Sequence, residues 1–330
     1  MPSESLQIAF IQYISRMFKE GDFSATYKFA FLNALADICI ESGLEERLVI
    51  PVRHITEKMI ELYWEQARPF SGKDKFLCQN AGTQAAMIFR IIAVQDTGVS
   101  LGAFKRDKVG FNKFVTTVNQ FVVTGPLWRL QILSDTPEEF LYKKHNGNQS
   151  IQLNSHIQQC FHIYYDLVIS LTRDRWQQKI RCLPVNYDLV GKKGDLENFL
   201  FGFQRKSLNK ARDVYRDIQQ GQCFYCHKSL QDDVAVDHFI PWARYPNDLG
   251  HNFVLAHTSC NSRKKDYLPS LEHLERWKTQ NIELHVDEIS ERLAAYFLCD
   301  ARRSLSVADW AYKVNAGKLW VKGGSFSAVD

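Results

Sequence analysis

Two short-spaced pairs of metal-ligand residues constrain this chain more than any other feature. Cys223 and Cys226 are separated by two residues, as are His257 and Cys260, and 30 residues lie between the pairs. Two ligands at this spacing can bind one ion from a single turn, and three thiolates with one imidazole form a common structural zinc set. We therefore expect these four residues to bind structural zinc; four unrelated buried residues are the weaker alternative. His227 is a less favoured substitute ligand.

The segment between the pairs predicts a small ββα unit. Residues 234–239 (VAVDHF) alternate as in a short strand, and residues 253–255 form a second apolar run. The intervening RYPNDLGHN is rich in loop-forming residues. Residues 259–268 contain no helix breaker and can form about two helical turns.

Several polar residues inside this unit have the order of a known signature. Asp237-His238, Asn252 and Cys260-Asn261-x2-Lys264 resemble the HNH endonucleases, or ββα-metal nucleases, in their zinc-stapled form. The resemblance covers residues 219–268. It has two departures: His257 stands where Cys is usual, and Asn261 stands where His is frequent. Both replacements keep a competent ligand, because imidazole binds zinc and an amide oxygen suits a hard cation.

The resemblance implies a metal-dependent nuclease site whose products carry 5′-phosphate and 3′-hydroxyl ends. His238 has an ordinary pKa of about 6.5, which suits a general base that deprotonates water. Asp237, on the opposite face of the strand, and Asn261, on the helix, are expected to bind catalytic Mg²⁺ or Mn²⁺. By family analogy, Asn252 ties the strands together and orients the loop that carries His238.

Other residues of the segment have more than one interpretation. Lys264, Lys265 and Arg244 are candidate substrate-binding residues that contact phosphate, although each could equally be a solvated charge. An isolated Asp-His pair is often a surface turn.

The joint order of these residues inside the zinc set makes hydrolysis of DNA by an HNH endonuclease the leading function. The alternatives are a zinc-stapled nucleic-acid-binding module without catalysis and an RNA-cleaving, toxin-like nuclease.

The rest of the chain predicts a mainly helical protein that is α+β overall. Apolar residues recur at three- and four-residue spacing over 6–18, 25–42, 52–67, 85–94, 111–123 and 156–180. We expect a helical domain at 1–182 with a β-hairpin near 140–154 turning at Asn146-Gly147, a linker at 183–204, the nuclease domain at 205–270 and a helical extension at 271–330.

The N-terminal region offers a second, separate resemblance. TYKFAFLNALADICIE (26–41) and LYWEQARPF (62–70) resemble helical regions of bacterial HNH proteins found in restriction or defence settings. A region of this size could recognise a nucleic-acid feature, bind a partner protein or form a homodimer. Its residue spacing does not choose among these roles.

Composition bears on the cellular compartment and on the partners of such a protein. No apolar run reaches the ~18 residues of a membrane span, so we expect no membrane contact. Three of the eight cysteines belong to the zinc set and the other five show no pairing pattern, which favours a reducing cytoplasm. The net charge is +4, of which residues 201–270 contribute +3. This excess lies beside the predicted phosphodiester site, where it favours a nucleic-acid partner.

Overall fold

The computed structural model describes residues 1–70, 75–81, 84–190, 195–202, 205–314, 317–323 and 325–327, without the side chains of residues 205–207. The chain forms two compact units. The first comprises Met1–Val99 and Phe104–Gly202, and the second comprises Ser100–Ala103 and Phe203–Asp330. Each unit is described by itself.

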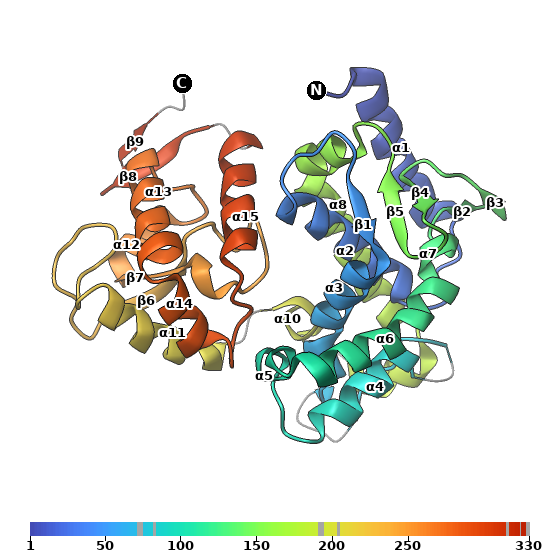
Figure 1. Ribbon diagram of the computed structural model, residues 1–330, viewed down its shortest axis with the longest axis horizontal. Coiled ribbons are helices and arrows are strands. Elements are labelled where there is room, and N and C mark those ends of the chain that lie inside the picture. Colours follow the sequence, from blue (N-terminus) through green and yellow to red (C-terminus); the bar gives the residue numbers. More distant parts are fainter. Residues whose placement is uncertain are drawn as a thin grey trace. The chain divides into compact units, whose positions relative to one another are not determined.

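The first unit is helical, with short strands at one part of it (Figure 1). Its helices are α1 (Glu4–Glu20), α2 (Tyr27–Glu41), α3 (Val52–Trp64), α4 (Ala86–Gln95), α6 (Lys108–Thr124), α7 (Pro126–Arg129), α8 (Ile157–Arg181), α9 (Tyr187–Val190) and α10 (Leu196–Phe201), with α5 (Leu101–Arg106) at the junction of the two ranges. Its strands are β1 (Val49–Pro51), β2 (Ile132–Leu133), β3 (Thr136–Pro137), β4 (Tyr142–His145) and β5 (Ser150–Leu153). All six predicted helices of this region are therefore confirmed.

Helix α2 forms the core of this unit, because it packs on α3, α7 and α8 and is buried along almost its whole length. A helix that is apolar on every side is stable only when surrounded. Two acidic residues of α2, Asp37 and Glu41, pair with the buried ammonium of Lys58 on α3. These ion pairs satisfy charges that burial would otherwise make costly.

The predicted hairpin at 140–154 is confirmed. Strands β4 and β5 are antiparallel, with His145 opposite Ser150, and β1 pairs with the other edge of β5. Asn146 and Gly147 both have positive φ in the connecting turn, a conformation that these two residue types tolerate best.

The region predicted as a linker, 183–204, contains regular structure in its described part. It forms the 3₁₀ turn η3 (Pro184–Asn186), α9 and α10, and it buries Leu183, Leu196 and Leu200. Residues 191–194 and 203–204 of the predicted linker lie outside the described residues.

The second unit places a two-stranded hairpin among helices (Figure 1). Its elements are α11 (Arg205–Ile218), β6 (Val234–His238), the 3₁₀ turn η4 (Gly250–Asn252), β7 (Phe253–His257), α12 (Thr258–Lys264), α13 (Leu271–Trp277), the π-helical η5 (Lys278–Leu284), α14 (Val286–Leu293), α15 (Ala301–Val314), β8 (Leu319–Lys322) and β9 (Ser325–Ser327). Strands β6 and β7 are antiparallel, and α11 and α12 pack on both. The predicted ββα unit is thus present.

The end of the chain differs from the predicted helical extension. After α15 the chain returns as the β8–β9 hairpin, and Trp320 pairs with Pro269 at the end of the ββα unit. The buried Trp320 ring packs against Tyr225 and His273. In the described part of the chain, no helix combines the length and apolar character needed to cross a membrane.

Candidate active site

The four predicted zinc ligands converge. The ligand atoms of Cys223, Cys226, His257 and Cys260 all lie within 4.8 Å of one another, as expected for donors around one tetrahedral ion. Cys223 and Cys226 come from the turn after α11, while His257 ends β7 and Cys260 lies in the first turn of α12. The sequence prediction of a Cys₃His set is therefore confirmed.

The surroundings of these donors suit a cation. The Nε2 atom of His257 lies 3.1 Å from the carbonyl oxygen of Ser229, which can only accept, so Nε2 carries the proton and Nδ1 is the ligand atom. Nδ1 lies 3.4 Å from the Sγ of Cys226. Burial and the neighbouring thiols of Cys223 and Cys226 raise the pKa of Cys260 to about 12. Three thiolates therefore need a positive ion between them, which a zinc ion would supply.

His227 is not part of this cluster. It is exposed and has a positive φ of 59°, and its backbone N–H donates to the carbonyl oxygen of Cys223. It closes the turn that holds the first ligand pair.

His238 ends β6 and is held on several sides. Its Nε2 lies 2.7 Å from Oδ1 of Asp248. The rings of Trp242 and Phe253 meet the imidazole edge-on, with centroids 5.3 and 5.0 Å away. Only 8% of the residue is exposed, so His238 is more enclosed than the sequence interpretation assumed. An ionised Asp248 can only accept, which places the proton on Nε2 and the basic lone pair on Nδ1.

Asp237 is held by two neighbours of different chemistry. The hydroxyl of Tyr225 donates to its Oδ2, and the ammonium of Lys264 lies 3.1 Å from Oδ1 and 3.0 Å from Oδ2. Burial and the Asp237 carboxylate raise the pKa of Tyr225, so its phenol stays protonated and donates. The carboxylate is thereby fixed in one orientation.

Lys264 differs from its sequence interpretation as a phosphate contact. It is completely buried, and its ammonium donates to Asp237 and to the carbonyl oxygen of His238. A lysine in this environment cannot reach a substrate. It instead links α12 to the end of β6, at the two residues of the Asp-His pair.

Asn252 pins the loop that follows His238. Its amide group accepts from the backbone N–H of Ile240 and donates to the carbonyl oxygen of the same residue, at 2.8 and 3.0 Å. Its own carbonyl oxygen accepts from the N–H of Phe239. Asn252, the last residue of η4, therefore joins the segment just before β7 to the loop that follows His238.

Asn261 lies in the middle of α12, three residues before Lys264. Residues at this spacing share one helix face, and the end of the Lys264 side chain reaches Asp237. The Asn261 side chain is partly exposed. Within the described residues its amide has no hydrogen-bond partner, so its oxygen is available to a ligand.

The remaining two candidates are Lys265, which directly follows α12, and Arg244, in the loop after β6. Lys265 is exposed, and the guanidinium of the half-buried Arg244 donates to the carbonyl oxygen of Asp266. The structure therefore groups Arg244 with the segment that follows Lys265.

Sequence reasoning missed Asp248 and Tyr225. Asp248 lies in a loop ten residues after its histidine, and Tyr225 lies inside the first zinc pair. The only sequence signal was their position within the motif-bearing segment.

Together the site offers an imidazole oriented by a carboxylate, a second carboxylate beside it and an amide oxygen on the adjoining helix. Such a set suits hydrolysis assisted by a hard cation.

Comparison with known proteins agrees with this geometry. Residues 223–270 match the family model described as HNH endonuclease, and residues 9–97 match one described as a domain of unknown function (DUF8808). No curated protein and no solved structure gives a significant match to the chain. The match at 223–270 contains all four zinc ligands and the Asp-His pair, so this segment is an HNH endonuclease domain whose Cys₃His cluster fits the zinc-stapled form.

Proposed function

We propose that this protein is a metal-dependent endonuclease that hydrolyses phosphodiester bonds in DNA. The observation that carries the proposal is the pair formed by His238 and Asp248, 2.7 Å apart, inside a segment that matches the HNH endonucleases. A carboxylate that fixes an imidazole is a recurring device for general-base catalysis. A purely structural zinc module has no need of it.

His238 acts as the base. With Nε2–H directed at Asp248, the Nδ1 lone pair takes a proton from a water molecule as the water oxygen attacks phosphorus. The imidazolium that forms is stabilised by the adjacent carboxylate. The rings of Trp242 and Phe253 hold the imidazole in place, so little reorientation is needed when the proton moves.

Asp237 and Asn261 would hold the catalytic divalent ion. A carboxylate and an amide oxygen are hard donors that suit Mg²⁺ or Mn²⁺. Asp237 already accepts from Tyr225 and Lys264, but an ionised carboxylate has about four lone-pair sites and can accept further contacts. When bound, such an ion neutralises charge on the phosphate and stabilises the departing 3′ oxygen.

Lys264 and Asn252 position the site. Lys264 fixes the Asp237 carboxylate and the carbonyl oxygen of His238, while Asn252 fixes the loop after His238. Substrate contacts are left to nearby cations, of which the exposed Lys265 and the half-buried Arg244 are the candidates. Their charges would contact phosphates without reading sequence.

The first experiment is a cleavage assay on matched substrates. Purified protein is incubated with Mg²⁺ or Mn²⁺ and end-labelled duplex DNA, single-stranded DNA and RNA of one sequence. We expect metal-dependent cleavage of DNA that leaves 5′-phosphate ends, with slower cleavage of RNA. Cleavage of RNA alone would mean that the substrate is RNA and not DNA, and would support the toxin-like alternative. Tight binding without cleavage of any substrate would reject the enzyme and leave the binding module.

The biological setting is a separate part of the proposal. The match at residues 9–97 is to a domain without an assigned function, so a restriction or defence role rests on the resemblance of residues 26–41 and 62–70 alone. A test is loss of phage protection in cells that carry His238→Ala compared with cells that carry the unchanged protein.

A further inference from the structure

The first unit contains a cavity of about 400 Å³ that is separate from the HNH domain. It is lined by the starts of α2, α4 and α7, the end of α6 and two residues of α3. This volume is within the range of small-molecule sites, which are mostly apolar with a few polar groups.

The walls of the cavity suit a flat ring. Tyr27, Tyr63 and Phe121 supply aromatic surface, and Met59 and Met87 add flexible apolar contacts. The Tyr63 hydroxyl is engaged by Thr26 at 2.9 Å, which fixes that ring at one side of the cavity. Aromatic side chains arranged around a hollow bind planar molecules by stacking.

Two polar residues of the lining add recognition groups. The backbone bridge between Asn80 and Ala25 fixes the position of Asn80, whose amide N–H₂ has no partner within the described residues. Arg129 lies on the exposed side of the lining, with its guanidinium 5.0 Å from the Trp128 ring. An amide and a guanidinium provide hydrogen bonds to a base edge and to an anion, respectively.

A buried cation next to this lining strengthens the case for an anion. Lys28 follows Tyr27 in α2 and is only 3% exposed. It has no hydrogen bond or ion pair within the described part of the chain, and its ammonium lies over the Phe23 ring, 5.3 Å from the centroid. Burial lowers the pKa of Lys28, the exposed Asp22 raises it, and the charge of Arg129 lowers it. A bound anion near these residues would add to the effect of Asp22 and favour the charged form of Lys28.

The first turns of α2 and α4 both lie at the cavity, and each is the positive end of its helix dipole. Neither α2 nor α4 has a side-chain cap at its first turn, where Tyr27 and Ala86 lie. Uncapped N–H groups and the helix dipole favour negative charge at such positions. These helix ends add to the attraction of Lys28 and Arg129 but would not define a site without the cavity.

We propose that this cavity binds a nucleotide, with the base between the aromatic walls and the phosphate near Arg129 and Lys28. The proposal goes beyond the nuclease function and assigns a ligand class to the unit that contains the domain of unknown function. A base with an attached phosphate could be a free mononucleotide or a nucleotide turned out of a DNA strand. Both share the chemistry that the cavity recognises.

Calorimetry with the full-length chain tests the proposal. The probes are the four deoxynucleoside 5′-monophosphates, the matching nucleosides and a short single-stranded oligonucleotide. We expect at least one nucleotide to bind with a Kd below about 1 mM, and its nucleoside about tenfold more weakly because the phosphate contacts are lost. Binding of the oligonucleotide alone would mean that the ligand is a nucleotide of a DNA strand, whereas binding of a mononucleotide would identify a small-molecule site.

Two variants locate the binding in the cavity. Arg129→Gln is expected to reduce affinity about tenfold, and Ala86→Phe is expected to block the cavity, since Ala86 is exposed at the start of α4. Arg181→Gln, an exposed arginine at the end of α8, is the matched control and should bind normally. The proposal is overturned if no probe binds, or if Arg129→Gln and Ala86→Phe bind as well as the control.

Discussion

At the scale of single residues, the chemistry of the HNH domain depends on how His238 is held. Its hydrogen bond to Asp248 fixes the tautomer, and the rings of Trp242 and Phe253 fix the plane. An imidazole restrained in this way needs no rotation before it accepts a proton. In the proposed reaction, Asp248 therefore acts through His238 as a positioning residue.

Replacing the carboxylate of Asp248 tests this role. In Asp248→Asn the amide can present N–H₂ to Nε2, which favours the tautomer whose basic nitrogen is Nε2. We expect a fall of about a hundredfold in the cleavage rate, with little change in substrate affinity. Asp232→Asn, an exposed aspartate of the same unit, should cleave normally. Single-turnover kinetics measure both, and equal rates would show that the hydrogen bond does not matter for the reaction.

Lys264 allows a second prediction about stability. Lys264→Met leaves the Asp237 carboxylate buried without its ion-pair partner, which should lower the free energy of unfolding by about 3 kcal/mol. Lys265→Met changes the exposed neighbour and should cost less than about 0.5 kcal/mol. Denaturant unfolding distinguishes the two. A similar loss in both variants would mean that the buried pair contributes little.

Site residues could be predicted from the sequence where they follow a fixed spacing pattern, and could not be predicted where their contacts depend on the path of a loop. The Asp237-His238 pair, Asn252 and the zinc ligands have a recognisable order and lie as the strand and helix pattern predicts. Asp248 could not be found this way, because its pairing with His238 depends on the path of a ten-residue loop. The burial of Lys264 was equally hidden, since a basic run at a helix end looks solvated.

At the scale of secondary structure, the ββα unit is joined by side chains at both ends. The Cys₃His cluster brings together the turn after α11 and the start of α12, and Lys264 joins the end of α12 to β6. A two-stranded hairpin alone is at best marginally stable in water. A zinc ion bound by these four ligands would therefore be part of the fold.

Removing one zinc ligand should unfold this unit. Cys260→Ser is expected to lose most of its bound zinc, because structural sites release the ion when a thiolate is missing. Elemental analysis should find about one zinc ion per unchanged chain, and the same for Cys182→Ser, an exposed cysteine of the other unit. Full zinc content in Cys260→Ser would contradict the assigned ligand set.

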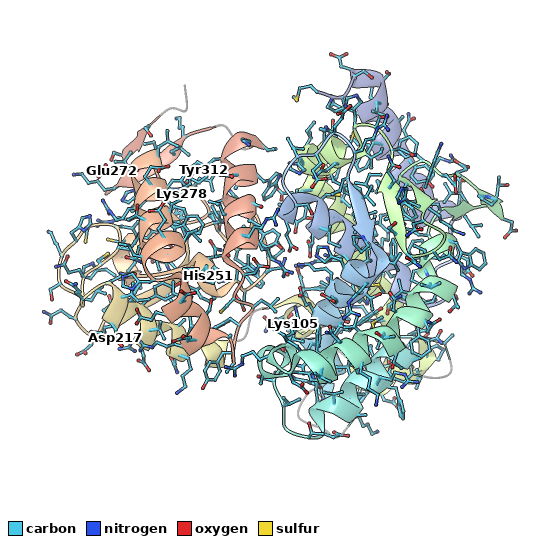
Figure 2. The ribbon with its side chains drawn as sticks, in the orientation of Figure 1. Lys105, Asp217, His251, Glu272, Lys278 and Tyr312 are labelled. Atoms are coloured by element: carbon cyan, nitrogen blue, oxygen red, sulfur yellow. The ribbon has the colours of Figure 1, made fainter. Side chains whose placement is uncertain are left out.

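A buried histidine predicts how the same unit responds to pH. His251 lies in the second unit (Figure 2) and is fully buried. Its Nε2 lies 3.1 Å from the carbonyl oxygen of Val286, and burial lowers its pKa. Below pH ~6.5 the unfolded chain binds a proton that folded His251 does not, so stability falls as the pH falls, by at most about 1.4 kcal/mol per pH unit.

Replacing this histidine isolates its effect from acid release of zinc. His251→Gln should show a shallower loss of stability between pH 7.5 and 5.5, while zinc release affects both proteins alike. Denaturant midpoints across this range provide the measurement. Parallel curves for the two proteins would mean that His251 does not contribute to the pH dependence.

Helices were predicted better than the last strands. Three- and four-residue periodicity located the helices of residues 6–180, because an amphipathic or fully apolar pattern needs only local sequence. The β8–β9 hairpin was missed because its position is fixed by Trp320, which pairs with Pro269 and packs on Tyr225. That partner choice depends on tertiary contacts, which single-sequence patterns do not contain.

At the scale of the whole molecule, the chain contains two cores with different sources of stability. The first contains the buried helix α2 and the ion pairs of Lys58, and the second contains the Cys₃His cluster that suggests structural zinc. The predicted boundary near residue 183 lies about 20 residues before the division at 202–203. Residues 183–204 were predicted as a linker, but Leu183, Leu196 and Leu200 within this range are buried.

Independent cores predict separable thermal transitions. Chelation of zinc should lower the transition of the second unit only. Lys58→Met leaves the buried carboxylates of Asp37 and Glu41 without this ion-pair partner. It should lower the transition temperature of the first unit by about 10 °C. Scanning calorimetry measures both effects in one chain. One transition that moves as a whole under either change would mean that the units unfold together.

The most direct test of the proposed enzyme is a comparison of two histidine variants in the full-length protein. His238→Ala removes the assigned base, and His227→Ala removes an exposed histidine of the same domain that is not a zinc ligand. With zinc content and unfolding midpoints matched, plasmid DNA and Mn²⁺ should give a nicking rate at least about a hundredfold lower for His238→Ala and an unchanged rate for His227→Ala. Equal nicking by the two variants would contradict the assignment of His238 as the catalytic base.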